Sequence, residues 1–209
     1  METDSIIPKL KRVQAAAAGV RNLADGQSRA LLRDLADRVT ANVGRILEAN
    51  QKDLEVMDDA DPKKDRLKLT EERIRDLAQS LRDVAGLDSP VGKVLLERTI
   101  EQGLQLKKVS VPLGVVGVIY ESRPNVTLDV ASLCLRSGNA CVLKGGKEAF
   151  HSNLALVGLI HESLAAFGVD PDAVLLLPTD RKYLAELLSA DQYVDIVIPR
   201  GSESLIHYV

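Results

Sequence analysis

Three polar or glycine-rich segments follow predicted strands, and they contain the residues of this chain best suited to bind a ligand. They are 121–125 (ESRPN), 144–147 (KGGK) and 200–202 (RGS). Glycines let the backbone approach a ligand, and the N–H groups at a helix start can bind phosphate. Ligands of open parallel sheets bind beyond the carboxyl ends of the strands. The three segments together therefore indicate a nucleotide site.

The standard nucleotide fingerprints are absent. No G-x-G-x-x-G follows a strand, and Gly146-Lys147 is followed by Glu148 rather than by Ser or Thr, so the segment is not a Walker A loop. Spacing alone leaves two interpretations open, a nucleotide site and ordinary turn glycines.

No catalytic or metal-binding group can be identified from spacing. Cys134 lies on an apolar helix face and Cys141 in a buried strand, so both are expected to be small core residues rather than reactive thiols. The histidines show no metal-ligand spacing, and the acidic stretch 58–65 lacks the glycine and closing glutamate of a calcium loop. We therefore expect a binding site and no metal.

Composition excludes several classes of protein. The 209 residues are 45% hydrophobic. There are 27 Lys and Arg and 30 Asp and Glu, so the chain has no net positive charge that would attract nucleic acid. The longest central apolar run, 113–120, is too short for a membrane span, and the N-terminus is acidic where a signal peptide is basic. Only two cysteines are present. We expect a cytoplasmic protein of a reducing compartment, without a membrane or nucleic-acid partner.

The first 90 residues have helical patterns. Thr70 is expected to cap a helix that begins with Glu71 and Glu72 and ends at Gly86. Ser28 is expected to cap another helix, whose apolar residues are spaced three or four apart. These apolar residues are Leu31, Leu32, Leu35, Val39, Val43, Ile46 and Leu47.

The pattern changes to alternating strands and helices after residue 90. Segments 94–98 and 105–110 are predicted to form a hairpin that bends around Gly103, and Gly138 and Gly168 are predicted to be left-handed helix C-caps. Strands are predicted at 115–120, 140–143, 174–177 and 194–198, with helices at 126–137, 152–167 and 181–189. This alternation predicts an α/β fold with a doubly wound parallel sheet. The final helix has barely begun at residue 209, so we expect a piece of a longer protein.

The stretch VPLGVVGVIYESRPNVTLDVASLCLRSGNACVLKGGKEA resembles the gamma-glutamyl phosphate reductase (glutamate-5-semialdehyde dehydrogenase) family, a branch of the aldehyde dehydrogenase superfamily. ANQKDLE, DRLKLTEERI and VDIVIPRGSESL resemble it too, from about residue 10 to the end. The resemblance implies an aldehyde dehydrogenase-like Rossmann variant. Residues 1–209 would form an incomplete NADP-binding domain: a helical lead-in (1–90), a hairpin belonging to an oligomerisation extension (91–112) and a parallel α/β sheet (113–209).

The family's activity is NADPH-dependent reduction of gamma-glutamyl phosphate to L-glutamate 5-semialdehyde and phosphate, in proline biosynthesis. The reaction passes through a cysteine thioester. Neither cysteine of this chain matches the family's nucleophile, which is expected in a catalytic domain beyond Val209. The resemblance further implies a homo-oligomer in full-length form and functional coupling to glutamate 5-kinase. The start at Met1 argues against a fused upstream kinase.

Two alternatives remain beside that activity. One is an aldehyde dehydrogenase of other specificity, which YESRPN and the lysine at position 147 disfavour. The other is a non-catalytic nucleotide-binding module, which the missing thiol segment favours.

The resemblance implies a set of cofactor-binding residues. They are Lys144, Gly145, Gly146, Lys147, Gly201, Ser202 and Leu205. Lys144 would hold the adenosine ribose, the Gly-Ser turn would face the pyrophosphate, and Leu205 would pack on adenine. Lys147 stands where many NAD-using relatives have a glutamate that binds the ribose 2′-hydroxyl. A lysine there could pair with a 2′-phosphate, which favours NADPH.

The segment after the first central strand matches the place of the superfamily's oxyanion-stabilising asparagine. Here that position is Ser122, with Arg123 and Asn125 nearby. Ser122, Asn125 or a backbone N–H could stabilise the oxyanion, and Arg123 could instead contact a carboxylate or phosphate of the substrate.

Overall fold

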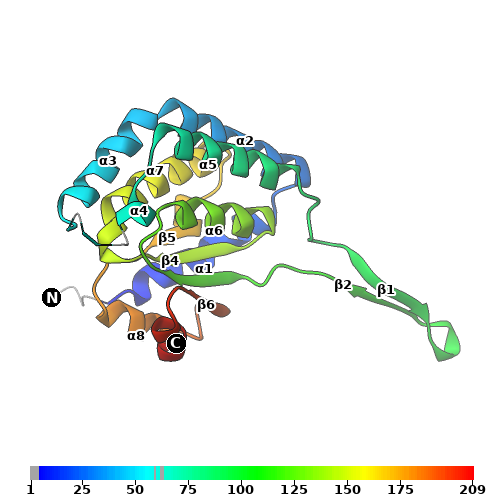
Figure 1. Cartoon of the computed structure of the whole chain (residues 1–209). Coiled ribbons are helices and arrows are strands. Elements are labelled where there is room, and N and C mark those ends of the chain that lie inside the picture. Colours follow the sequence, from blue (N-terminus) through cyan, green and yellow to red (C-terminus); the bar gives the residue numbers. More distant parts are fainter. Residues whose placement is uncertain (1–4, 59, 62–63) are drawn as a thin grey trace.

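A four-stranded parallel sheet forms the centre of the computed structural model, which describes residues 5–58, 60–61 and 64–209 (Figure 1). Its strands are β3 (Val115–Tyr120), β4 (Ala140–Lys144), β5 (Val174–Leu176) and β6 (Ile196–Arg200), in the order β5-β4-β3-β6. All residues of β3 and β4 are buried, which explains why both strands are apolar up to Lys144 at the end of β4. The predicted parallel sheet is confirmed, although β6 begins two residues later than expected.

Helices cover both faces of this sheet. The crossover helices α6 (Asn125–Arg136) and α7 (Phe150–Ala166) lie on one face, while α1 (Ile7–Arg21) and the short α8 (Lys182–Leu188) lie on the other (Figure 1). The predicted crossover helices are confirmed. Gly138 and Gly168 have φ angles of +76° and +68°, as expected of left-handed helix C-caps.

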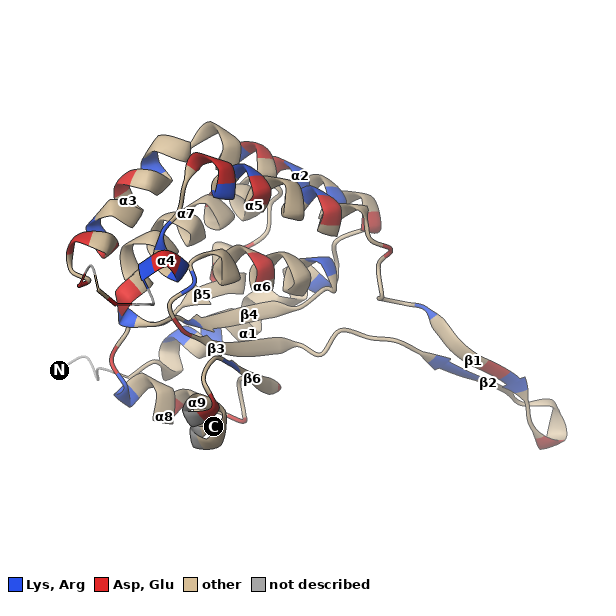
Figure 2. Cartoon of the chain, in the orientation of Figure 1, with Lys and Arg blue, Asp and Glu red and all other residues tan. Residues whose placement is uncertain are grey.

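A second helical layer packs on α6 and α7. It contains α2 (Asp25–Ala41), α3 (Val43–Glu55), the one-turn α4 (Lys64–Leu67) and α5 (Glu71–Gly86). Figure 2 shows charged residues gathered on α2, α3 and α5, whereas the strands of the parallel sheet are almost free of them. This distribution is typical of an outer layer with one face in solvent.

Thr70 caps α5 as predicted, because its Oγ1 accepts a hydrogen bond from the Arg73 N–H at 3.1 Å. The prediction for Ser28 is wrong. Helix α2 already begins at Asp25, and the Gln27 side chain accepts from the Ala24 N–H at 2.9 Å to complete the helix start. The single helix predicted to extend to residue 47 is also broken, at Asn42.

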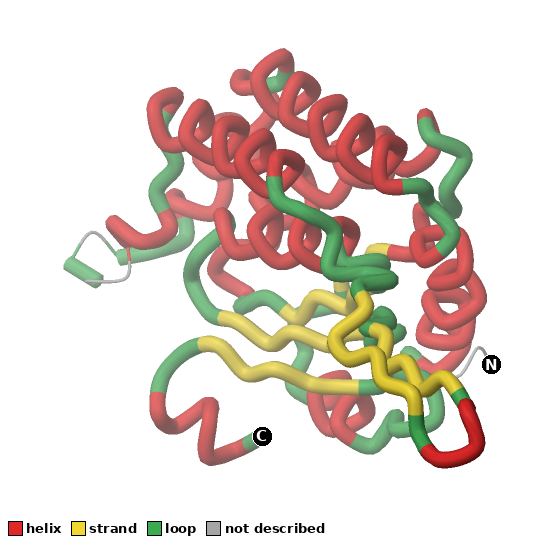
Figure 3. The backbone as a smooth tube through the Cα atoms, turned by 90° about the vertical axis from the view of Figure 1, so that its right-hand side faces the viewer, coloured by secondary structure: helices red, strands yellow, loops and turns green. Residues whose placement is uncertain are grey.

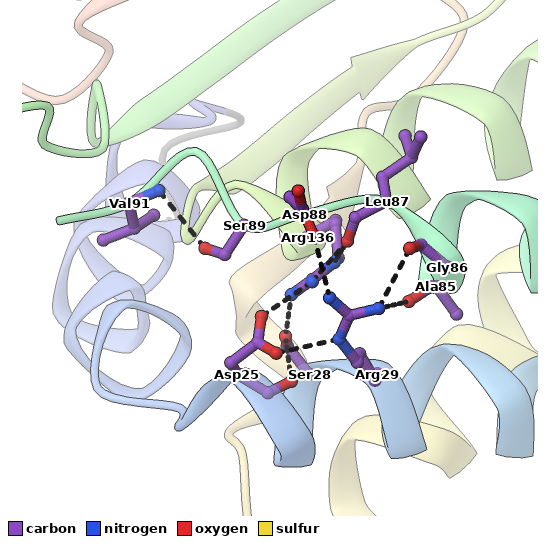
Figure 4. A network of polar contacts seen from close by, with 10 residues as sticks. All are labelled: Asp25, Ser28, Arg29, Ala85, Gly86, Leu87, Asp88, Ser89, Val91 and Arg136. Carbon is purple, nitrogen blue, oxygen red and sulfur yellow. Dashed lines mark hydrogen bonds and ion pairs between the residues drawn. The ribbon is translucent and has the colours of Figure 1, made fainter. Parts of the chain in front are cut away.

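Ser28 instead belongs to a polar network that joins three helices (Figure 4). Its Oγ accepts from the Arg136 guanidinium at 2.7 Å, and Arg136 also donates to the Leu87 carbonyl and to Asp25. The network ties the start of α2 and the end of α5 to the last turn of α6.

The predicted hairpin extends away from the body of the molecule (Figures 1 and 3). Strands β1 (Val94–Thr99) and β2 (Gln105–Val109) pair antiparallel, and Gly103 has a φ of +80° in the turn. Every residue of both strands is exposed. Within the described residues, no helix has both the length and the apolar character that crossing a membrane requires.

Candidate functional site

The three strand-end segments singled out in the sequence meet at the carboxyl edge of the sheet, where two glutamates link them. Glu148, in the short helical turn Lys147–Ala149, accepts from the N–H and the Oγ of Ser122 at 2.7 and 2.5 Å. Glu121, after β3, accepts from the N–H and Oγ of Ser202 at 3.0 and 3.1 Å. The segment after β3 is thus bonded to those after β4 and β6. Sequence reasoning placed the segments correctly but missed both linking carboxylates.

Ser122 is held in a strained backbone conformation. It is buried and has a φ of +29°, in the region that disfavours side chains. The carboxylate of Glu148 stabilises this conformation through its two hydrogen bonds. A Cβ at Gly146 would lie 2.3 Å from Glu148 Oε1, so the glycine is what lets the carboxylate reach Ser122. The hydroxyl hydrogen of Ser122 is therefore already used.

Three other donors in this segment remain open to a ligand. The Asn125 amide donates one hydrogen to Asp129 at 3.2 Å, which leaves the second available. Burial raises the pKa of Asp129, the acceptor in that bond. In the described part of the chain, the backbone N–H groups of Arg123 and Asn125 have no acceptor. These groups can therefore donate hydrogen bonds to a ligand.

The turn after β4 combines a buried cation with an exposed one. Lys144 Nζ donates to the carbonyls of Thr179 and Gly145 at 3.0 and 3.3 Å. Burial lowers the pKa of Lys144, and the carboxylates of Glu148 and Asp180 partly oppose that shift. Lys147 is exposed, and its side chain makes no ion pair or hydrogen bond with any described residue. One amine is thus fixed by the protein, and the other is available to an anion.

A buried hydrogen-bond chain supports this turn from below. Thr127 donates to Asn153 Oδ1 at 2.8 Å and accepts from the Tyr120 hydroxyl at 2.7 Å. Burial raises the pKa of Tyr120, so the hydroxyl stays protonated and donating. A Cβ at Gly145 would lie 2.4 Å from Asn153 Nδ2. The turn can rest on this support only because residue 145 is glycine.

A cavity of about 540 Å³ opens between the ends of β3 and β6. It lies where the chain order of the sheet reverses, the usual ligand position in such sheets. Three arginines line it: Arg123, Arg200 and Arg66. Arg66 belongs to α4 in the outer helical layer, and nothing in the sequence signalled that it would reach this edge.

The segment that begins α9 (Glu203–Tyr208) lies at the same edge. Leu205 is partly buried against the core, and a Cβ at Gly201 would lie 2.7 Å from the Glu121 carboxylate. Because that carboxylate already accepts from Ser202, an anion could bind the Ser202 N–H only after displacing it.

The two cysteines are core residues, as predicted. Cys134 and Cys141 are both free and buried. A hydrogen bond with Cys134 and burial raise the pKa of Cys141, so neither has the exposed, electropositive setting of a nucleophile.

Comparison with known proteins gives a consistent set of matches. Residues 11–209 match the model of the aldehyde dehydrogenase family. The gamma-glutamyl phosphate reductase of Chlorobium phaeobacteroides is 52% identical over 205 residues, which are 98% of this chain and 49% of that protein. This chain therefore spans about half the length of the curated relatives that it matches.

Solved structures give the same match. The gamma-glutamyl phosphate reductase of Thermotoga maritima superposes with a TM-score of 0.93 at 35% identity, covering 98% of this chain and 50% of that one. The corresponding Saccharomyces cerevisiae structure gives a TM-score of 0.88 at 34% identity, covering 96% and 52%. The expected aldehyde dehydrogenase-like α/β fold and the resemblance to these reductases are both confirmed.

Proposed function

Because the chain belongs to the aldehyde dehydrogenase family, we propose that the protein carrying it reduces gamma-glutamyl phosphate to L-glutamate 5-semialdehyde with NADPH and releases phosphate. This is a step of proline biosynthesis. The observation that carries the proposal is the linked carboxyl edge, where Glu148 bonds the segment holding the oxyanion donors to the turn holding Lys144 and Lys147. One rigid unit can then position both a cofactor and a reacting carbonyl.

The residues of the turn after β4 fit a phosphorylated dinucleotide. NADPH, when bound, supplies the hydride. The glycines at 145 and 146 let the backbone approach a ligand, and Lys147 presents an unpaired charge to solvent. We assign Lys147 to the 2′-phosphate and Lys144 to the adenosine ribose. Gly201, Ser202 and Leu205 would complete the site once Glu121 moves from Ser202.

The loop after β3 is assigned to the reacting end of the substrate. Asn125 and the backbone N–H groups of residues 123 and 125 would stabilise the developing oxyanion. Ser122 acts through its backbone conformation, since its hydroxyl is bonded to Glu148.

Substituting Lys147 with glutamate is expected to shift the cofactor preference away from the 2′-phosphorylated dinucleotide. The new carboxylate would repel the 2′-phosphate and could accept from the 2′-hydroxyl, so the ratio of kcat/KM for NADP⁺ to that for NAD⁺ should fall at least tenfold, about 1.4 kcal/mol. The assay follows phosphate-dependent oxidation of L-glutamate 5-semialdehyde by NADP⁺ and NAD⁺ in the full-length protein.

Lys9→Glu is the matched control, since it makes the same charge change on α1, across the sheet. Absence of any phosphate-dependent turnover in the wild type would refute the proposed function. Normal turnover with an unchanged preference in Lys147→Glu would refute only the assignment of Lys147.

We also propose that the full-length protein is a homo-oligomer joined through the hairpin. The hairpin exposes large apolar side chains, among them Leu95, Leu104 in its turn, and Val109, at 60%, 62% and 43%. The double substitution Leu95→Asp, Leu104→Asp is expected to lower the molar mass in light scattering to that of one chain. Val56→Asp, at a site 82% exposed on the body, should leave the mass unchanged. A wild-type protein with the mass of one chain would contradict the proposal.

An acyl phosphate hydrolyses readily in water, so functional coupling to the glutamate 5-kinase that supplies it is part of the proposal. The free buried thiols favour a reducing compartment, and we place the protein in the cytoplasm.

A further inference from the structure

A second cavity adjoins the one between β3 and β6. It has a volume of about 360 Å³ and lies among α4, the start of α5 and the loop after β3. The two cavities share Arg66 and Arg123 in their linings, so these arginines stand where the cavities meet. The volume is within the range of small-ligand sites.

Some of the charged side chains that line this second cavity have hydrogen-bond or ion-pair partners, and others have none among the described residues. Arg73 is occupied: it donates to the carbonyls of Asp65 and Lys68 at 2.7 Å and pairs with the Asp65 carboxylate at 3.2 Å. The side chains of Arg66, Arg123 and Asp76, in contrast, make no hydrogen bond or ion pair with any residue that the structure describes. Among the described residues, the cavity therefore has two guanidinium groups, the ammonium group of Lys68 and one carboxylate available to a ligand.

The backbone that carries Arg66 is fixed without help from its own side chain. Leu67 is fully buried, and its carbonyl accepts from Asn50 Nδ2 at 2.9 Å. Arg73 holds the carbonyl of Asp65, within α4, and the carbonyl of Lys68, directly after it. Arg66 is thus presented from a rigid turn, as expected of a group placed for recognition.

From this arrangement we propose that the second cavity binds the α-amino-acid end of the substrate. Arg66 and Arg123 would bind the α-carboxylate through the paired donors of their guanidinium groups, and Asp76 would bind the α-ammonium. Leu69 and Leu77, which line the same cavity, would contact the methylene groups. This assignment rests on the proposed function. The acyl phosphate end then extends toward Asn125 and the loop after β3.

Calorimetric titration of the 209-residue chain and of the full-length protein with L-glutamate tests this assignment directly. Arg66→Ala and Arg123→Ala are each expected to weaken L-glutamate binding at least tenfold. Asp76→Asn should weaken L-glutamate but not glutarate, which lacks the ammonium group. Arg75→Ala is the matched control and should bind normally: Arg75 lies beside Asp76 on α5, and Glu71 is its ion-pair partner among the described residues.

In the full-length protein, Arg66→Ala should raise KM for L-glutamate 5-semialdehyde at least tenfold and leave KM for NADP⁺ unchanged. A merely structural role would change both. Wild-type binding of L-glutamate by Arg66→Ala, or equal binding of L-glutamate and inorganic phosphate by the wild type, would overturn the assignment. An active Arg66→Ala protein with an unchanged KM for L-glutamate 5-semialdehyde would overturn the subsite alone. Absence of turnover in the wild type would overturn the proposed function.

Discussion

Replacing Asp53 with alanine is expected to lower the free energy of unfolding by about 3 kcal/mol or more, because three donors, two of them buried, would lose their acceptor at about 1–3 kcal/mol each. The carboxylate of Asp53, 1% exposed in α3, accepts from the backbone N–H groups of His151 and Ser152 at 3.0 and 2.8 Å. It also accepts from the Ser152 hydroxyl at 2.6 Å. Asp53 therefore caps the start of α7 from a different helix, where the helix dipole favours a negative charge.

The effect of this substitution should extend to the turn after β4. Helix α7 begins directly after the segment Lys147–Ala149, so a start of α7 that is no longer held would loosen Glu148 and Lys147. We expect Asp53→Ala to weaken NADPH binding as well as stability. Urea denaturation followed by circular dichroism, with cofactor titration below the transition, measures both.

Two comparison variants separate the cap from general effects of charge. Lys52→Ala removes a neighbouring exposed side chain that pairs with Glu48, and should change stability by less than about 0.5 kcal/mol. Asp53→Asn keeps one acceptor oxygen and should lie between Asp53→Ala and the wild type. If the free energy of unfolding of Asp53→Ala were within about 1 kcal/mol of the wild-type value, the cap would be of little importance, because that is the net contribution of an average hydrogen bond.

The parts of the fold that the sequence predicted well depend on local pattern. Strands β3 and β4 are buried on both faces, so they appear in the sequence as apolar runs. Thr70 caps α5 through a bond that lies within three residues. The strand-end segments were found in the same way, because glycine and proline mark turns wherever the chain folds.

The errors and omissions involve partners that are distant in sequence. Ser28 has the residue type of an N-cap, but its hydroxyl oxygen accepts a hydrogen bond from Arg136, 108 positions later. Arg66 lies in a charged stretch that has no periodic pattern, and its place beside Arg123 follows only from the packing of the outer layer. Glu148 was visible only as the residue that excludes a Walker A loop. Its bonds to Ser122 depend on the pairing of β3 with β4.

Replacing Arg136 with alanine is expected to cost about 3–5 kcal/mol of unfolding free energy, the range for breaking a buried, hydrogen-bonded charge. Its side chain is 3% exposed and donates to the Leu87 carbonyl at 2.5 and 3.1 Å, to Ser28 Oγ at 2.7 Å and to Asp25 Oδ1 at 2.7 Å (Figure 4). Alanine would leave the Leu87 carbonyl without these donors. Lysine has no planar fork and can restore only part of the loss.

The control for Arg136 is Arg33→Ala, an exposed arginine of α2 that is expected to change stability by less than about 0.5 kcal/mol. Thermal and urea unfolding of the variants measure the effect. Equal stabilities of Arg136→Ala and Arg33→Ala would mean that the network in Figure 4 does not hold the helices together.

The dependence of the unfolding free energy on pH, at acid pH, tests the same network independently. Hydrogen bonds from Arg29 and Arg136 lower the pKa of Asp25 below its usual value in the folded chain. The folded state then binds fewer protons than the unfolded state, so this contribution is present above the unfolded pKa and is lost as the pH falls through the lowered one. In Arg136→Ala, Arg29 is the one cation of the described residues that remains paired with Asp25. The difference in unfolding free energy between the wild type and Arg136→Ala should therefore shrink as the pH falls below the ordinary carboxyl range. A difference that stays constant with pH would show that Arg136 acts through Leu87 and Ser28 alone.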